Sequence, residues 1–265
     1  RKQAGTKFSE AGLERFYECD AKYDLMGKLK SGEYKQELDE IVEYMIFSNE
    51  DKKRFLEMLM YCLGFVREAM VLDTVTAVCI CEEICQMMFL PEQEREILYY
   101  ATLIHDIGML AIPKEIVLAP RRLKKEEMKI IERHVEITQR HLEKRMKDEV
   151  LSIVLAHHER GDGSGYPRHL KEGQISLHQG ILQLVDVVSA LVSKKSYREA
   201  MPKQRVIELL NQDASKKRLK QQIVSMFVNS YDEIMEHVKK ETARTLKMYQ
   251  TLNLQYQQVS KKYKI

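Results

Sequence analysis

The stretch that most constrains this chain runs from Leu155 to Pro167 and reads Leu-Ala-His-His-Glu-Arg-Gly-Asp-Gly-Ser-Gly-Tyr-Pro. It follows an apolar segment with helical spacing, and it sets His157 and His158 side by side ahead of a glycine-rich loop. Imidazole is a common ligand for divalent metals of the first transition row. Adjacent residues on a helix point about 100° apart, so two such imidazoles do not easily bind one ion. The pair favours two neighbouring ions, or one metal ligand beside one substrate contact.

Further candidate ligands lie in apolar helical runs elsewhere in the chain. His105 and Asp106 end one run, His134 lies on the apolar face of another, and Asp186 lies in the middle of a third. An unpaired buried charge is very costly, so an aspartate in an apolar run needs a partner. The gaps between 105 and 134 and between 157 and 186 are both 29 residues, so each ligand can come from a different helix of one bundle. Any one of these candidate ligands alone is more simply explained as a polar core residue with its hydrogen bonds made. Together they predict a polynuclear metal site.

Apolar residues at helical spacing recur along the chain, and no β pattern is visible, so we expect an all-α fold. Residues 1–50 are interpreted as an N-terminal helical adaptor, residues 51–215 as the domain that carries the candidate ligands, and residues 216–265 as a C-terminal helical extension. From Met235 to Tyr263 apolar residues recur three and four apart, which is typical of a coiled-coil seam. The seam would serve a homodimer or pack back on the same chain, and the sequence leaves both open.

The composition argues against several other classes of protein. A formal net charge of +3 on 265 residues does not indicate nucleic-acid binding. No apolar run approaches the length of a bilayer span and no signal peptide is visible, so we expect this segment to be cytoplasmic, without a membrane contact. The five cysteines are expected to be free thiols in a reducing compartment. Because the chain begins at Arg1, we expect it to be a piece of a longer protein with other domains.

Taken together, the motifs resemble the HD-GYP domain, a subgroup of the HD metal-dependent phosphohydrolases. The residues that carry the resemblance are His105-Asp106-Ile107-Gly108, Ile112-Pro113, His134, His157-His158-Glu159, Asp162 to Pro167, Asp186 and the segment from Ser193 to Arg198. The resemblance covers the region from Phe65 to Leu210. It implies that residues 51–215 are an HD-GYP domain with the helical bundle of HD domains, flanked by the N-terminal extension and a long C-terminal helix.

The resemblance also implies an activity, which is hydrolysis of the cyclic dinucleotide cyclic di-GMP to the linear dinucleotide and GMP in bacterial signalling. Two metals about 3.5–4 Å apart lower the pKa of a bridging water and clamp the phosphate oxygens. The mixed shell of histidine and carboxylate favours Fe or Mn, and two or three ions are expected. The implied metal ligands are His105, Asp106, His134, His157, His158, Asp186 and Asp73.

Other residues receive roles from the same resemblance. Asp106, which would bridge the metals, and His158 are expected to be catalytic. Lys195 and Arg198 would hold phosphate oxygens. A loop that shapes the substrate pocket or docks a GGDEF-domain protein would be formed by Gly163, Gly165, Tyr166 and Pro167.

The chain departs from the family pattern at several positions. Asp73 takes the place of a metal-binding histidine, Met109 replaces a lysine, and Ser189 replaces a second aspartate. Gly180 and Ala119 replace two further basic residues. The alternative function is therefore a degenerate module that binds metal and nucleotide, or a GGDEF-type partner, without useful turnover. A purely structural bundle would not need the six matching ligands together.

Overall fold

The computed structural model describes residues 9–43, 48–64, 68–193 and 200–263. Within these ranges the chain forms helices and no strand, apart from one isolated antiparallel bridge between Asp162 and Lys171. The prediction of an all-α fold is therefore confirmed. No helix in the described ranges combines the length and apolar character needed to span a bilayer.

The chain divides into two compact units, residues 1–55 and residues 56–265. The first unit contains α1 (Glu10–Tyr23), α2 (Leu25–Ser31), α3 (Tyr34–Glu43) and the beginning of α4 (Asn49–Gly64). Ser9 caps α1, because its hydroxyl accepts a hydrogen bond from the amide of Gly12. Gly32 ends α2 with a φ of 81°, as expected for a glycine after a helix. No residue of α1 or α2 is buried, so these helices contribute no core of their own.

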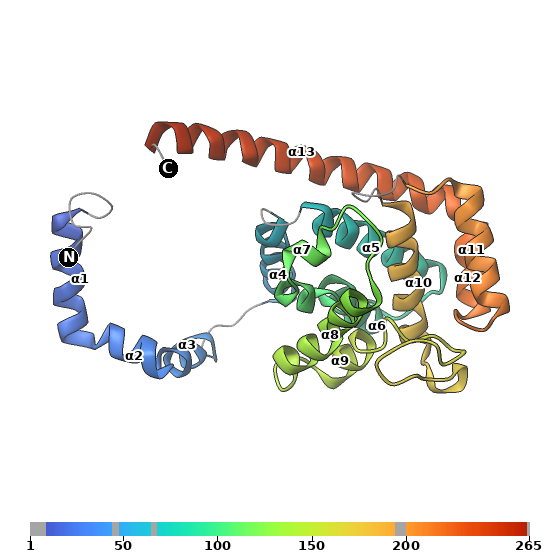
Figure 1. The fold of residues 1–265 in the computed structure, drawn as a ribbon, viewed down its shortest axis with the longest axis horizontal. Helices are drawn as coiled ribbons and strands as arrows, with labels where there is room; N and C mark the ends of the chain where they lie inside the picture. Colours follow the sequence, from blue (N-terminus) through green and yellow to red (C-terminus); the bar gives the residue numbers. More distant parts are fainter. Residues whose placement is uncertain (1–8, 44–47, 65–67, 194–199, 264–265) are drawn as a thin grey trace. The chain divides into compact units, whose positions relative to one another are not determined.

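The second unit carries the remaining helices (Figure 1). Their bounds are α5 (Glu68–Met87), α6 (Glu92–Ile104), η1 (Ile107–Ala111), α7 (Lys114–Val117), α8 (Lys125–Leu142), α9 (Asp148–Val154), η2 (Glu172–Gln174), α10 (Leu177–Val192), α11 (Lys203–Ser215), α12 (Gln221–Asn229) and α13 (Tyr231–Tyr263). The expected domain boundaries at residues 51 and 216 remain predictions.

The helix α5 forms the centre of this unit. It packs against α6, α10, α12 and α13, and it is apolar around much of its circumference, as is typical of a buried helix. Ile80 and Ile84 are fully buried in it. Cys79, Cys81 and Cys85 are buried there as free thiols, which confirms the expectation for these three cysteines.

The first half of α13 lies along α5, as Figure 1 shows. Val238 and Thr245 are buried in this contact, so the start of the predicted seam packs back on its own chain. Further along α13, Leu254 and Tyr256 are 61% and 64% exposed. The homodimer remains a prediction.

The helix α10, which carries the candidate ligand Asp186, begins at Leu177. Its start is fixed by a reciprocal cap, in which the Ser176 hydroxyl accepts from the Gln179 amide and the Gln179 side chain accepts from the Ser176 amide.

Candidate metal centre

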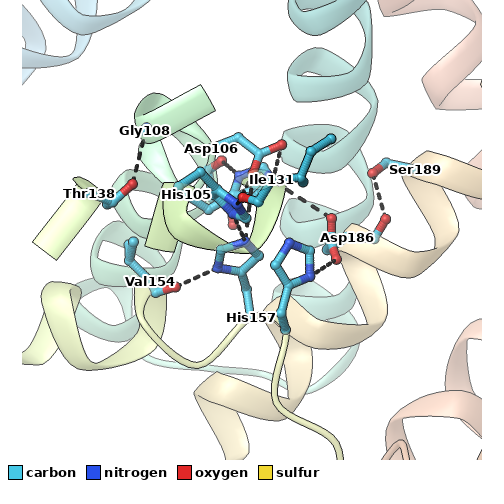
Figure 2. Close-up of polar contacts among 12 residues, drawn as sticks. His105, Asp106, Gly108, Ile131, Thr138, Val154, His157, Asp186 and Ser189 are labelled. Atoms are coloured by element: carbon cyan, nitrogen blue, oxygen red, sulfur yellow. Dashed lines mark hydrogen bonds and ion pairs between the residues drawn. The ribbon is translucent and has the colours of Figure 1, made fainter. Parts of the chain in front are cut away.

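Four segments of the second unit bring the predicted ligands together (Figure 2). His105 and Asp106 follow the end of α6, His134 lies in α8, and Asp186 lies in α10. The adjacent histidines follow the end of α9. Residues from four helical segments therefore meet at one place, as the 29-residue spacings predicted.

Gly108 lets the segment after α6 approach α8 closely. A Cβ atom at this position would lie 2.1 Å from the carbonyl oxygen of His134 and 2.5 Å from Oγ1 of Thr138. The amide of Gly108 instead donates a hydrogen bond to Thr138 Oγ1 at 3.0 Å. The glycine thus places Asp106, two residues earlier, beside His134.

Three buried histidines share one hydrogen-bonding arrangement. In each, Nδ1 donates to the backbone carbonyl three residues earlier, over 2.7 Å for His105, 2.6 Å for His134 and 2.5 Å for His157. For His105 and His157 that carbonyl belongs to the last turn of a helix, where carbonyls lack a full set of helical partners. A proton on Nδ1 leaves Nε2 with a lone pair, which is the form that binds metals. The local backbone therefore orients all three rings as ligands.

Asp106 lies between these histidines. Its Oδ1 is 3.4 Å from Nε2 of His134 and 3.6 Å from Nε2 of His157, while its Oδ2 is 3.7 Å from Nε2 of His105. The two carboxylate oxygens thus face different histidines, an arrangement suited to a bridging ligand. The Nε2 atoms of His134 and His157 are 3.2 Å apart. Two such nitrogens repel each other unless a cation or a shared proton lies between them.

Asp186 extends the centre towards His158. Its Oδ1 is 3.9 Å from Nε2 of His105, and its Oδ2 is 3.3 Å from Nδ1 of His158. The two adjacent histidines therefore face different carboxylates. They lie beyond Val154, where α9 ends, so the 100° separation of neighbouring helical residues does not apply. Ligand atoms of Asp106, His134, His157 and His158 all lie within 4.8 Å of one another.

A cavity of about 80 Å³ adjoins the centre between α5 and α10. It is lined by Asp73, Thr74, His105, Asp106, Asp186, Ser189 and Ala190. Asp73 thus lies beside His105, Asp106 and Asp186, three of the other predicted ligands. The hydroxyl of Ser189 donates to the carbonyl of Asp186 at 3.0 Å.

The electrostatics favour the metal-binding protonation states of Asp106, Asp186 and His158, but not of His157. Burial opposes ionisation of Asp106 and Asp186, but the surrounding histidines hold the pKa of both carboxyls below the usual range. Burial, assisted by the neighbouring His157, lowers the pKa of His158 to about 4. Burial also acts on His157, but contact with the two aspartates raises its pKa. The centre therefore holds charged carboxylates and a neutral His158, while a proton on His157 would compete with a metal.

The glycine-rich loop is attached to the centre through Glu159. This carboxylate is fully buried and accepts hydrogen bonds from the amides of Arg168 at 2.6 Å and Leu170 at 2.9 Å. A Cβ at Gly165 would lie 2.4 Å from the carbonyl oxygen of His158, so only glycine permits this return of the chain. The ring of Tyr166 lies against His158, with 4.8 Å between ring centroids and the two planes tilted by 37°.

The predicted loop residues thus lie next to the centre. Gly163 has a φ of +80° and Gly165 makes the close approach, as their residue type suggested. The family motif included Glu159 without a role for it, although a carboxylate directly after two predicted ligands was a signal. Lys195 and Arg198 lie outside the described residues, so their phosphate-binding role stays a prediction.

The donor set fits a group of divalent metal ions. Two donors bound to one ion at about 2.1 Å each lie at most about 4.2 Å apart. The contacts of Asp106 and Asp186 with the histidines span 3.3–3.9 Å, within this limit. Neutral imidazoles and ionised carboxylates are the ligand forms that divalent transition metals require.

An all-helical bundle with a His-Asp pair at the end of one helix, and further histidines converging on it, defines a metal-binding hydrolase of the HD type. The family model of the HD domain matches residues 57–223, and the chain belongs to this family. HD-domain phosphohydrolases bind divalent metals, and the cluster around Asp106 is suited to hold them.

Several curated proteins are similar to the chain. The 3'3'-cGAMP-specific phosphodiesterase 2 of Vibrio cholerae is 30% identical over 158 residues, which are 58% of this chain and 30% of that protein. A cyclic di-GMP phosphodiesterase of Thermotoga maritima is 35% identical over 146 residues, or 54% of this chain and 39% of that protein. The response regulator RpfG of Xanthomonas campestris, also a cyclic di-GMP phosphodiesterase, is 38% identical over 120 residues, or 44% of this chain and 32% of that protein. The aligned part of the chain spans about a third of the length of these relatives.

Proposed function

We propose that this chain is a metal-dependent phosphodiesterase that hydrolyses a cyclic dinucleotide. The observation that carries the proposal is the placement of Asp106, whose two oxygens face separate histidines in a buried centre. The names of the curated relatives support this substrate class, because they include phosphodiesterases of cyclic di-GMP and of 3'3'-cGAMP. The products would be the linear dinucleotide and, from cyclic di-GMP, GMP.

The proposed cofactor is a set of two or three divalent ions, with Fe or Mn as the metal. When bound, such ions supply an activated water and stabilise charge on the phosphate. The chain's own contribution is orientation. The backbone carbonyls fix the histidine rings, Asp106 presents one oxygen to each side of the centre, and Asp186 orients His158. Tyr166, which contacts His158, would line the substrate pocket. Lys195 and Arg198 would bind the phosphates of the substrate.

Partners and location belong to the same proposal. The glycine-rich loop would contact the nucleotide or a GGDEF-domain protein. The exposure of Ser164 and Pro167 in this loop supports that role. A homodimer through α13 is supported by the exposed Leu254 and Tyr256 beyond the part that packs on α5. We also propose that this segment works in the cytoplasm, where cyclic dinucleotide messengers would be encountered.

The test is product analysis with cyclic di-GMP and 3'3'-cGAMP, using protein loaded anaerobically with Fe(II) or Mn(II). We expect the linear dinucleotide to form with at least one of the two substrates. The Asp106→Asn variant should lose about a hundredfold or more in rate, by analogy with removal of one transition-state contact. The exposed Asp148, at the start of α9, provides a matched control as Asp148→Asn. If the fully loaded protein binds nucleotide but leaves it uncut, the degenerate binding module replaces the enzyme.

A further inference from the structure

We propose that the centre has two chemically unlike metal positions, and that Asp73 makes one of them select a hard ion such as Mn²⁺. The inference rests on the proposed metal-dependent function and concerns which ion each position takes. We call the position formed by His134, His157 and Oδ1 of Asp106 the histidine side. We call the position formed by Asp73, His105, Asp186 and Oδ2 of Asp106, with the hydroxyls of Thr74 and Ser189, the carboxylate side.

The histidine side is a tripod with two nitrogen donors. The three distances among Nε2 of His134, Nε2 of His157 and Oδ1 of Asp106 are 3.2, 3.4 and 3.6 Å. Both histidines are almost completely buried, so their orientation is fixed by the core. Imidazole-rich positions suit ions such as Fe²⁺ and Zn²⁺.

The carboxylate side is rich in oxygen. Three aspartates and two hydroxyl-bearing residues line its cavity, with His105 as the one imidazole in the lining. His158 contacts Asp186 from outside this lining, with its Nδ1 3.3 Å from Oδ2 of Asp186. Nε2 of His105 lies 3.7 Å from Oδ2 of Asp106 and 3.9 Å from Oδ1 of Asp186. His105 is 4% exposed, and its Nδ1 is committed to the carbonyl of Thr102, so the Nε2 lone pair is directed towards the carboxylates. This buried nitrogen is what distinguishes the cavity from a merely acidic surface cluster.

The two sides therefore differ in both donor type and charge. Carboxylate and hydroxyl oxygens favour Mn²⁺ and Mg²⁺ over imidazole-preferring ions. Three carboxylates and one imidazole line the cavity, so the donors on this side are mostly oxygen. Asp73 is the one of these aspartates that comes from α5 rather than from the His-Asp pair or α10. Its replacement should change the carboxylate side without removing the bridging Asp106.

The experiment measures binding without nucleotide. The full chain is stripped of metal by a chelator and given one equivalent of Zn²⁺, which is diamagnetic and does not change oxidation state. Mn²⁺ is then titrated, and the paramagnetic resonance signal of free Mn²⁺ reports how much is bound. We expect one Mn²⁺ per chain beside one Zn²⁺. Asp73→Asn should weaken Mn²⁺ binding at least about tenfold while Zn²⁺ stays bound.

Matched variants separate the two sides. His134→Gln should weaken Zn²⁺ binding more than Mn²⁺ binding, which is the opposite pattern to Asp73→Asn. Asp73→His should take up a second Zn²⁺ in place of Mn²⁺, and the exposed control Asp148→Asn should change neither ion. If Asp73→Asn does not fold by circular dichroism, Ser189→Asp adds a carboxylate to the same cavity and should strengthen Mn²⁺ binding.

Two results would overturn the inference. One is that the chain with one Zn²⁺ binds no Mn²⁺, and the other is that folded Asp73→Asn or Ser189→Asp binds Mn²⁺ with unchanged affinity. Failure of the proposed function is recognised separately, because it would appear as uncut nucleotide with the two-sided binding pattern intact. Hydrolysis by a centre whose two positions bind the same ions equally would refute only this inference.

Discussion

Replacing Gly108 by alanine should separate the His-Asp segment from α8 and thereby loosen the metal centre. The new Cβ would lie 2.1 Å from the carbonyl oxygen of His134, whereas real Cβ contacts essentially never fall below 3.0 Å. The two segments must therefore move apart by about 0.9 Å, into a core with little spare volume. The same movement stretches the 3.0 Å hydrogen bond from the Gly108 amide to Thr138.

The magnitude follows from these two effects. Forcing an extra carbon into a packed site costs about 1–3 kcal/mol, and leaving a buried amide without its partner costs about 1–3 kcal/mol more. We expect Gly108→Ala to lower the free energy of unfolding by about 2–6 kcal/mol. Metal affinity should also fall, by about tenfold or more, because Asp106 no longer faces His134 at ligand distance.

Urea unfolding of the metal-free protein, followed by circular dichroism, measures the stability, and competition with a chelator measures the metal affinity. Gly173→Ala is the matched control, because a Cβ at Gly173 would meet no atom within 4 Å. It should change stability by no more than about 0.5 kcal/mol. If Gly108→Ala behaves like Gly173→Ala in both assays, the close approach of the two segments does not position the centre as described.

Three further outcomes are expected. Glu159→Gln should lower stability by about 1–3 kcal/mol, because one of two amides loses its carboxylate acceptor; an unchanged melting temperature would contradict this. Tyr166→Ala should weaken nucleotide binding in calorimetry while metal content stays constant, since the ring contacts His158 without being a ligand; loss of metal would show instead that the ring supports the centre. Iodoacetamide should label the exposed Cys19 well before Cys79, because burial raises the pKa of the Cys79 thiol to about 12; mass spectrometry showing equal labelling of the native protein would refute the buried position.

The general fold was predictable because helical periodicity is a local property of the sequence. The position of Asp186 was predictable for a related reason, since a carboxylate in the middle of an apolar helix requires a partner. The geometry of His157 and His158 was harder to predict. The apolar pattern continues through Leu155, so it does not reveal that α9 ends at Val154 and that the two rings follow turn geometry.

Other parts of the centre depend on contacts between distant segments. Glu159 accepts hydrogen bonds from amides nine and eleven residues further along the chain. No periodic sequence pattern predicts that the loop folds back on Glu159 in this way. The place of Asp73 in the cavity depends on how α5 packs beside α10. The sequence suggested Asp73 only through its spacing to His105 in a family pattern, and that spacing did not show which donors would surround it.

The central position of α5 bears on how this centre can evolve. Any shift of α5 would disturb its contacts with α6, α10, α12 and α13 at once, so selection against misfolding should hold the backbone beside Asp73 in place. A change of residue type at position 73 alters the cavity without moving that backbone. Under the proposed assignment of Asp73, a single substitution on α5 would change the metal preference of this centre while its shape stays the same.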